Sequence, residues 1–143
     1  MKFSITQESN LDQSKVTQIH SIGIEIDNYI KNENFGSSIE KIIIGVVCVK
    51  PEFEQFFKVR KPKYVKEKTE THSGTSVSIS KVFTFDVKLD YNSYLALDGD
   101  DLRNSLLKKI IESLSNLNNL PKQIVDFNKV DFIEKLKGLS GIN

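Results

Sequence analysis

The chain has 143 residues, a length typical of a single domain around one hydrophobic core. One cysteine excludes an intrachain disulfide, and 20 Lys and Arg against 19 Asp and Glu remove the simplest argument for a dedicated nucleic-acid binder. The longest apolar run, residues 42–49, is too short to span a bilayer, and the first residues lack the apolar core of a signal peptide. We therefore expect one domain over residues 1–143, cytoplasmic and without a membrane partner.

The first half of the chain predicts a strand, a long helix and a second strand. Residues 2–7 alternate apolar and polar side chains, as a short strand does. Apolar residues then follow helical spacing, with Ser9 or Asp12 as the cap, and Gly23 on the apolar arc favours close packing. The arc consists of Val16, Ile19, Ile22, Ile26, Tyr29 and Ile30. Residues 42–49 are apolar on both alternating faces, which predicts a central strand covered on both sides.

The middle of the chain predicts two more strands. In residues 52–68 an extended chain would place Phe53, Phe57 and Val59 on one face, and Pro62 makes this an edge strand or a break. Residues 69–75 predict a turn. Residues 77–89 alternate most clearly, with polar side chains on one face, which favours an antiparallel, one-sided sheet. Lys81 and Val82 interrupt that alternation and predict a bulge or a bend.

The last third predicts helices. Asp98 is a good N-cap, with Asp100 and Asp101 in the first turn. The apolar face of this helix consists of Leu102, Leu106, Leu107, Ile110, Ile111, Leu114 and Leu117. Pro121 ends the helix, and a shorter one from about residue 128 would point Val130, Ile133 and Leu136 inward and stop at Gly138. The expected fold is therefore α+β and two-layered: a mainly antiparallel sheet of about four strands, with a long N-terminal helix and C-terminal helices packed on it.

No catalytic motif is visible. Cys48 lies in the most apolar stretch, where a thiol is inert, and neither His20 nor His72 has a partner at metal-ligand spacing. The glycines form no phosphate-binding loop. We expect no catalytic residues, no cofactor and no metal. The alternative, an enzyme with scattered residues, would use the three acidic residues of the helix cap together with His72.

The most uneven feature is a basic segment, residues 58–68. It contains Lys58, Arg60, Lys61, Lys63, Lys66 and Lys68, and Phe56, Phe57 and Tyr64 are interleaved with them. Three interpretations stay open: lysines and a proline that protect an edge strand from aggregation, a surface for a protein partner, or a ribbon that tracks phosphates. Carboxylates gather later, over residues 86–101, and opposed patches of this kind steer protein association.

An ordered series of segments carries a resemblance over most of residues 1–137. MKFSITQ opens the chain, and a helix-like stretch leads into NENFGSSIEKIIIGVVCV. PEFEQFFKVRKPKYVKEK, then FDVKLDYNSYLALDGDDLRNSLLKKIIESL, and finally VDFNKVDFIEKL follow. This order resembles the bacterial polymorphic-toxin immunity proteins of the immunity protein 44 type.

The resemblance implies a small cytoplasmic binding protein that neutralises a cognate toxin domain, with no catalysis and no cofactor. Aromatic residues are the natural anchors of a tight interface, and charged residues form its rim. The candidate anchors are Phe56, Tyr64 and Tyr94. The candidate rim residues are Lys58, Arg60, Lys61, Lys63 and Lys66. An exposed edge strand offers a second use, pairing with a copy of the chain, and the alternative function is a nucleic-acid-binding module built on residues 58–68.

Overall fold

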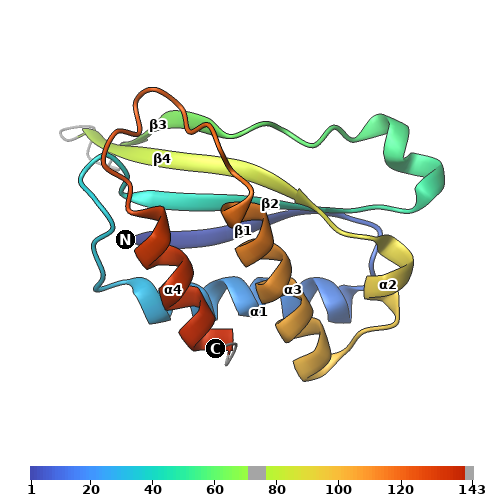
Figure 1. The fold of residues 1–143 in the computed structure, drawn as a ribbon. Coiled ribbons are helices and arrows are strands. Elements are labelled where there is room, and N and C mark those ends of the chain that lie inside the picture. The colour runs from blue at the N-terminus through green and yellow to red at the C-terminus, as the bar shows by residue number, and fades with distance from the viewer. Residues whose placement is uncertain (71–76, 141–143) are drawn as a thin grey trace.

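A four-stranded sheet with helices packed on one face forms the core of the computed structural model, which describes residues 1–70 and 77–140 (Figure 1). In spatial order the strands are β1 (Lys2–Ser9), β2 (Lys41–Cys48), β4 (Val77–Lys88) and β3 (Lys63–Glu70). The helices are α1 (Gln13–Ile30), α2 (Tyr91–Leu95), α3 (Gly99–Ser115) and α4 (Lys129–Ser140), with a short 3₁₀ helix, η1 (Pro51–Phe56). The fold is α+β, as predicted. Most of the predicted turn over residues 69–75 lies outside the described residues, and so does His72.

The strand directions correct the predicted pairing. β1 pairs with β2 and β2 with β4 in parallel, and only β3 and β4 are antiparallel. The sheet is therefore mixed and not mainly antiparallel, because α1 carries the chain back to the start of the sheet before β2 begins. The long helix is also the second element, since β1 precedes it. The polar face of β4 indicates which side of the strand no helix covers, but it carries no information on whether the neighbouring strands run parallel or antiparallel to it.

Helix α1 begins where its cap predicts. The Asp12 carboxylate accepts a hydrogen bond from the Lys15 amide at 3.0 Å. Gly23 faces β1 so closely that a Cβ there would lie 3.2 Å from Ile5 Cγ1. The remaining buried residues of α1 are Ile19, Ile22, Ile26 and Ile30. The helix thus packs its apolar face directly on β1, and the glycine allows the close approach.

Strand β4 is continuous and has no bulge. Its register with β3 runs without a shift from Val77 to Thr84. Lys81 lies on the same face as Phe83 and donates from Nζ to the Ser37 carbonyl at 3.3 Å, while Val82 is buried on the opposite face. The alternation is therefore interrupted because a polar side chain, Lys81, lies on the apolar face and an apolar one, Val82, lies on the polar face. The backbone itself is regular.

The C-terminal helix corrects another prediction. Val130 is 66% exposed, whereas Phe132 is fully buried and contacts Phe35 edge to face, with ring centroids 5.0 Å apart. The helix begins at Lys129 and continues past Gly138 to Ser140. Its inward face is Phe132, Ile133 and Leu136, so the apolar stripe starts two residues later than the periodicity suggested.

A carboxylate joins the two long connections at one end of the molecule. Asp126, between α3 and α4, accepts hydrogen bonds from the Ser37 amide at 2.7 Å, the Ser37 hydroxyl at 2.6 Å and the Ser38 amide at 2.8 Å. The Asn128 amide donates to the Phe35 carbonyl at 2.7 Å beside it. These bonds stabilise the charged form and hold the pKa of Asp126 well below its usual range.

Replacing Asp126 by Asn should lower the thermal stability at neutral pH and flatten its acid dependence. A carboxyl whose pKa is depressed by folding stabilises the protein above its unfolded pKa, and this contribution disappears as the pH falls. Thermal unfolding from pH 7 to pH 3 measures both effects. The control is Glu52→Gln, which neutralises an exposed carboxylate on η1. Identical pH profiles for Asp126→Asn and the unchanged protein would contradict the role given to this carboxylate.

Candidate functional site

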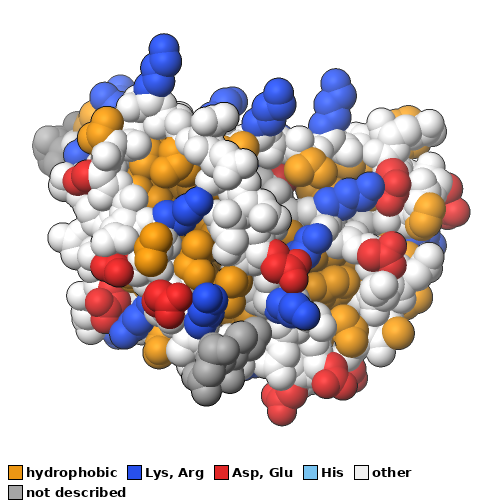
Figure 2. All heavy atoms as spheres, viewed as in Figure 1, with side chains coloured by type: hydrophobic (Ala, Val, Ile, Leu, Met, Phe, Trp, Pro, Cys, Tyr) orange, Lys and Arg blue, Asp and Glu red, His pale blue; other side chains and the backbone are white. Residues whose placement is uncertain are grey.

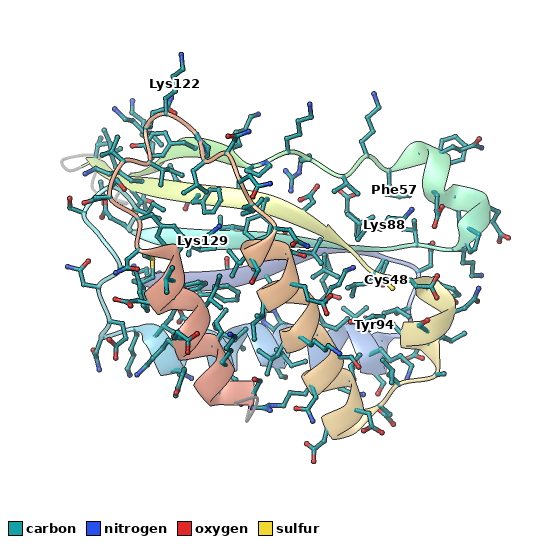
Figure 3. The ribbon with its side chains drawn as sticks, viewed as in Figure 1. Cys48, Phe57, Lys88, Tyr94, Lys122 and Lys129 are labelled. Atoms are coloured by element: carbon teal, nitrogen blue, oxygen red, sulfur yellow. The ribbon has the colours of Figure 1, made fainter. Side chains whose placement is uncertain are left out.

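The basic segment lies along one edge of the sheet. We use the name basic edge for residues 58–68, of which residues 58–62 are irregular and the rest belong to β3. Lys and Arg side chains project from the top of Figure 2, the side on which β3 lies in Figure 1, and Lys122 of the connection between α3 and α4 is among them (Figure 3). The extended chain predicted from Phe53 is wrong for its first part, because η1 occupies Pro51–Phe56. Pro51 stands at the start of η1, a position that its fixed φ angle suits.

An ion pair between Arg60 and Asp86 fixes the irregular part of the basic edge. The Arg60 amide donates to Asp86 Oδ2 at 2.7 Å, and its guanidinium donates to the same carboxylate from Nε and Nη2, both at 3.0 Å. The Asp86 side chain is only 3% exposed, whereas that of Arg60 is 64% exposed. Asp86 raises the pKa of the Arg60 guanidinium by hydrogen bonding and by its charge. Arg60 is therefore committed to holding its own segment in place.

Gly45 makes room for this pair. It lies on β2 directly opposite Asp86, on the face that the helices leave uncovered. A Cβ at Gly45 would lie 2.2 Å from Asp86 Oδ1 and 3.1 Å from Arg60 Nη2. Any other residue would push the carboxylate away from Arg60. The prediction that β2 is covered on both sides is right in effect, but side chains cover the second face there, and no helix does.

Among the side chains that the structure describes, the lysines of the basic edge have no acidic partner. Lys58, Lys61, Lys63, Lys66 and Lys68 are all exposed, and in the part of the chain that the structure describes none forms an ion pair. Glu67, the acidic residue among them, is engaged with Lys41 of β2 at 3.9 Å. The near-neutral total charge of the chain therefore conceals an edge with uncompensated positive charge.

An apolar groove lies beside three of these lysines, Lys58, Lys61 and Lys63. It encloses about 460 Å³ and is lined by residues 58–63, Val65, Thr84 and Phe85. Val59 and Val65 are both more than a third exposed in it. Sequence analysis missed these two valines as candidate contacts, although the alternation around Tyr64 places Val65 on the other face. Apolar surface ringed by charge is the usual arrangement of a protein-binding site.

The three aromatic candidates are not equivalent. Phe56 is 70% exposed on η1 and stands at one end of the basic edge. Tyr64 is half-buried and packs against the core. Tyr94 is only 7% exposed and lies beside Cys48 (Figure 3), so it is a core residue and not an available anchor. Burial raises the pKa of Tyr94 to about 12 and that of Cys48 to about 11, which keeps both groups neutral.

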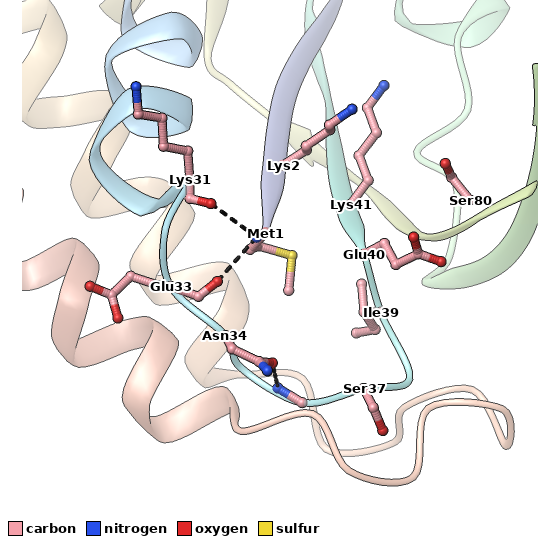
Figure 4. Close-up of a pocket in the computed structure, with 11 residues that line it drawn as sticks. Met1, Lys2, Lys31, Glu33, Asn34, Ser37, Ile39, Glu40, Lys41 and Ser80 are labelled. Atoms are coloured by element: carbon pink, nitrogen blue, oxygen red, sulfur yellow. Dashed lines mark hydrogen bonds between the residues drawn. The ribbon is translucent and has the colours of Figure 1, made fainter. Parts of the chain in front are cut away.

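Another hollow, of about 480 Å³, lies at the amino ends of β1 and β2 (Figure 4). The Met1 amino group donates there to the carbonyls of Glu33 at 3.0 Å and Lys31 at 3.4 Å. Most of the residues that line the hollow are polar or charged, and they include Lys2, Lys31, Lys41 and Glu40. Within residues 1–70 and 77–140 no three His, Cys, Asp or Glu residues gather as a metal site would need, and no helix is long and apolar enough to cross a membrane.

The acidic residues considered for catalysis have structural work instead. The Asp98 carboxylate accepts from the Gly99 amide at 3.1 Å and from the Gln18 side-chain amide at 2.7 Å, which caps α3 and ties it to α1. These bonds lower the pKa of Asp98. Asp100 and Asp101 are exposed in the first turn, where carboxylates favour the helix dipole.

Replacing Asp86 by Ala should release residues 58–62 from the sheet. We expect faster amide hydrogen exchange at Arg60 and a free energy of unfolding lower by about 1 kcal/mol, because one amide and one guanidinium lose their acceptor near solvent. The control Glu67→Ala breaks the exposed pair with Lys41 and should cost less than about 0.5 kcal/mol. Unchanged exchange at Arg60 in the Asp86 variant would show that another contact holds the segment.

Comparison with known proteins gives the family. No curated protein and no solved structure shows significant similarity to the chain. The family model for immunity protein 44 matches residues 1–139, a range that includes every strand and all but the last residue of α4. Because the match spans nearly the whole sequence, the chain belongs to the immunity protein 44 family.

Proposed function

We propose that the protein binds a cognate bacterial toxin domain through the basic edge and neutralises it by protein–protein contact. The family supplies the class of function. The observation that supports the location is the set of five lysines without an ion pair among the described residues, three of which, Lys58, Lys61 and Lys63, line an apolar groove. Unpaired charge and exposed apolar surface are both unfavourable in an isolated protein, and a partner with the complementary surface relieves both at once.

The two parts of the surface would have different tasks. Val59 and Val65 would be desolvated in the groove and Phe56 at one end of the basic edge, and burial of apolar area would supply most of the affinity. The lysines would attract the partner from a distance and so raise the rate of association. Neutralisation by occlusion needs no catalytic group and no cofactor on this chain. It requires only that the covered part of the toxin be needed for activity.

The direct test is co-expression with the toxin domain encoded beside this chain. Growth should be restored, and the two purified proteins should form a complex in size-exclusion chromatography and titration calorimetry. A toxin that remains active in cells that contain this protein, together with no complex in vitro, would overturn the proposal.

Reversing two charges on the basic edge should slow association with that toxin. We expect Lys58→Glu combined with Lys61→Glu to reduce the association rate about tenfold or more at low salt, and less at high salt. The matched control reverses Lys108 and Lys109, which are exposed on α3, and so changes the net charge equally. Equal slowing by both double variants would mean that the total charge matters and the basic edge does not.

Nucleic-acid binding is the second candidate, because the same unpaired lysines suit phosphates. Stacking platforms favour it less: of the three interleaved aromatic residues only Phe56 is largely exposed, since Phe57 and Tyr64 are half-buried. Filter binding of a single-stranded oligonucleotide at low and moderate salt separates the two candidates, since phosphate contacts weaken steeply with salt. Tight oligonucleotide binding without a toxin complex would favour this second function.

A further inference from the structure

The two edges of the sheet differ in what covers them. At the β1 edge the amide of Phe3 points away from β2 and donates to the Asp27 carboxylate of α1 at 2.7 Å. Gln7 of the same strand donates from its side chain to the Val16 carbonyl at 2.9 Å. Helix α1 thus runs beside β1 and satisfies part of its free edge (Figure 1). At this edge the amide of Phe3 is therefore no longer available to a further strand.

The β3 edge is open. The Asp86 amide donates to the Arg60 carbonyl at 3.4 Å, on the side of β4 where β3 lies, whereas the Leu89 amide donates to the Val47 carbonyl of β2. The backbone N–H and C=O groups of the even-numbered residues of β4 therefore point toward β3. In the observed antiparallel register these residues pair with Lys63, Val65 and Glu67. The backbone groups of Tyr64, Lys66 and Lys68 therefore point outward. In the described part of the chain no group bonds to them.

The charges on this edge decide what can pair with it. Lysines stand on both faces of β3, with Lys63 on the uncovered face and Lys66 and Lys68 on the face of the helices. A second copy would bring the same unpaired lysines alongside, and like charges on neighbouring strands repel. A strand that carries carboxylates meets no such repulsion. It would also place alternate side chains next to Val65 and the apolar groove.

We propose that an acidic, extended segment of the toxin domain adds to the free edge of β3 as a fifth strand. This inference rests on the proposed function and specifies its mode of binding. Backbone hydrogen bonds to Tyr64, Lys66 and Lys68 supply the alignment, and the lysines select the acidic sequence. Arg60, held by Asp86, keeps the lysines just before β3 at the start of the docking edge.

Amide hydrogen exchange tests the hydrogen bonds in the unmodified protein. In the complex with the toxin domain, exchange should slow at Tyr64, Lys66 and Lys68. The amides of Val65 and Glu67 already donate to β4 and should change much less. Slowing that is equal at odd and even positions, or absent at the even ones, would overturn strand addition even though a complex forms.

A backbone variant tests the same point by affinity. Lys66→Pro removes an outward amide that β4 does not use, so the sheet can keep its ladder. Lys66→Gln removes only the charge. We expect the proline variant to bind the toxin about tenfold or more weakly than the glutamine variant, the effect of one lost buried hydrogen bond and a blocked edge. Equal affinities would show that side chains alone make the contact. Thermal unfolding checks that both variants are folded. If the proline variant is not folded, the hydrogen-exchange pattern of the unmodified protein decides whether a strand is added.

The outcomes separate the mode of binding from the function. Absence of any complex with the unmodified protein removes the proposed function, whereas a complex with neither signature removes only strand addition. Sedimentation of the protein alone examines the remaining occupant, a second copy. Self-association that Lys66→Pro abolishes would overturn the proposal in favour of pairing between copies.

Discussion

The Asp86 carboxylate is the contact on which the candidate site depends. It lies on the face of the sheet that the helices leave uncovered, and Arg60 covers it with both its amide and its guanidinium. Gly45 is the reason that a carboxylate fits there at all. Because this ion pair anchors residues 58–62 against β4, the lysines on either side of Arg60 have a defined direction. A flexible loop of the same composition would lose more conformational entropy on binding.

Local patterns predicted the elements well, and long-range relations poorly. Asp98 was identified as a helix cap, and Asp12 as one of two candidates with Ser9, because a cap depends on residues within one turn. Strand direction depends on how the chain travels between strands, and alternation within a strand is the same in either direction. Val130 failed for a related reason: in a short helix, two neighbouring phases fit nearly equally well, and contact with Phe35 selects the one that buries Phe132.

The site could be predicted as a charge pattern but not as a surface. The lysines of residues 58–68 are consecutive in sequence, so their common edge was visible. Tyr94 was misplaced because nothing near it in sequence reveals that α2 packs it beside Cys48. The pair of Arg60 and Asp86 joins residues 26 positions apart, and no local signal marks it. Arg60 was consequently counted with the rim of the interface, although it is bound within the protein.

Protection of an edge strand and recognition of a partner need not be alternatives here. A row of lysines on β3 prevents pairing with any edge that is neutral or basic, a copy of this chain included. The same row leaves one kind of strand that meets no repulsion, namely an acidic one. At the other edge the Asp27 carboxylate already accepts a hydrogen bond from the Phe3 amide, whereas no described group bonds to the outward amides of β3. On this argument the lysines exclude neutral and basic strands as well as attracting an acidic one, and the outward amides of β3 align the strand that is added.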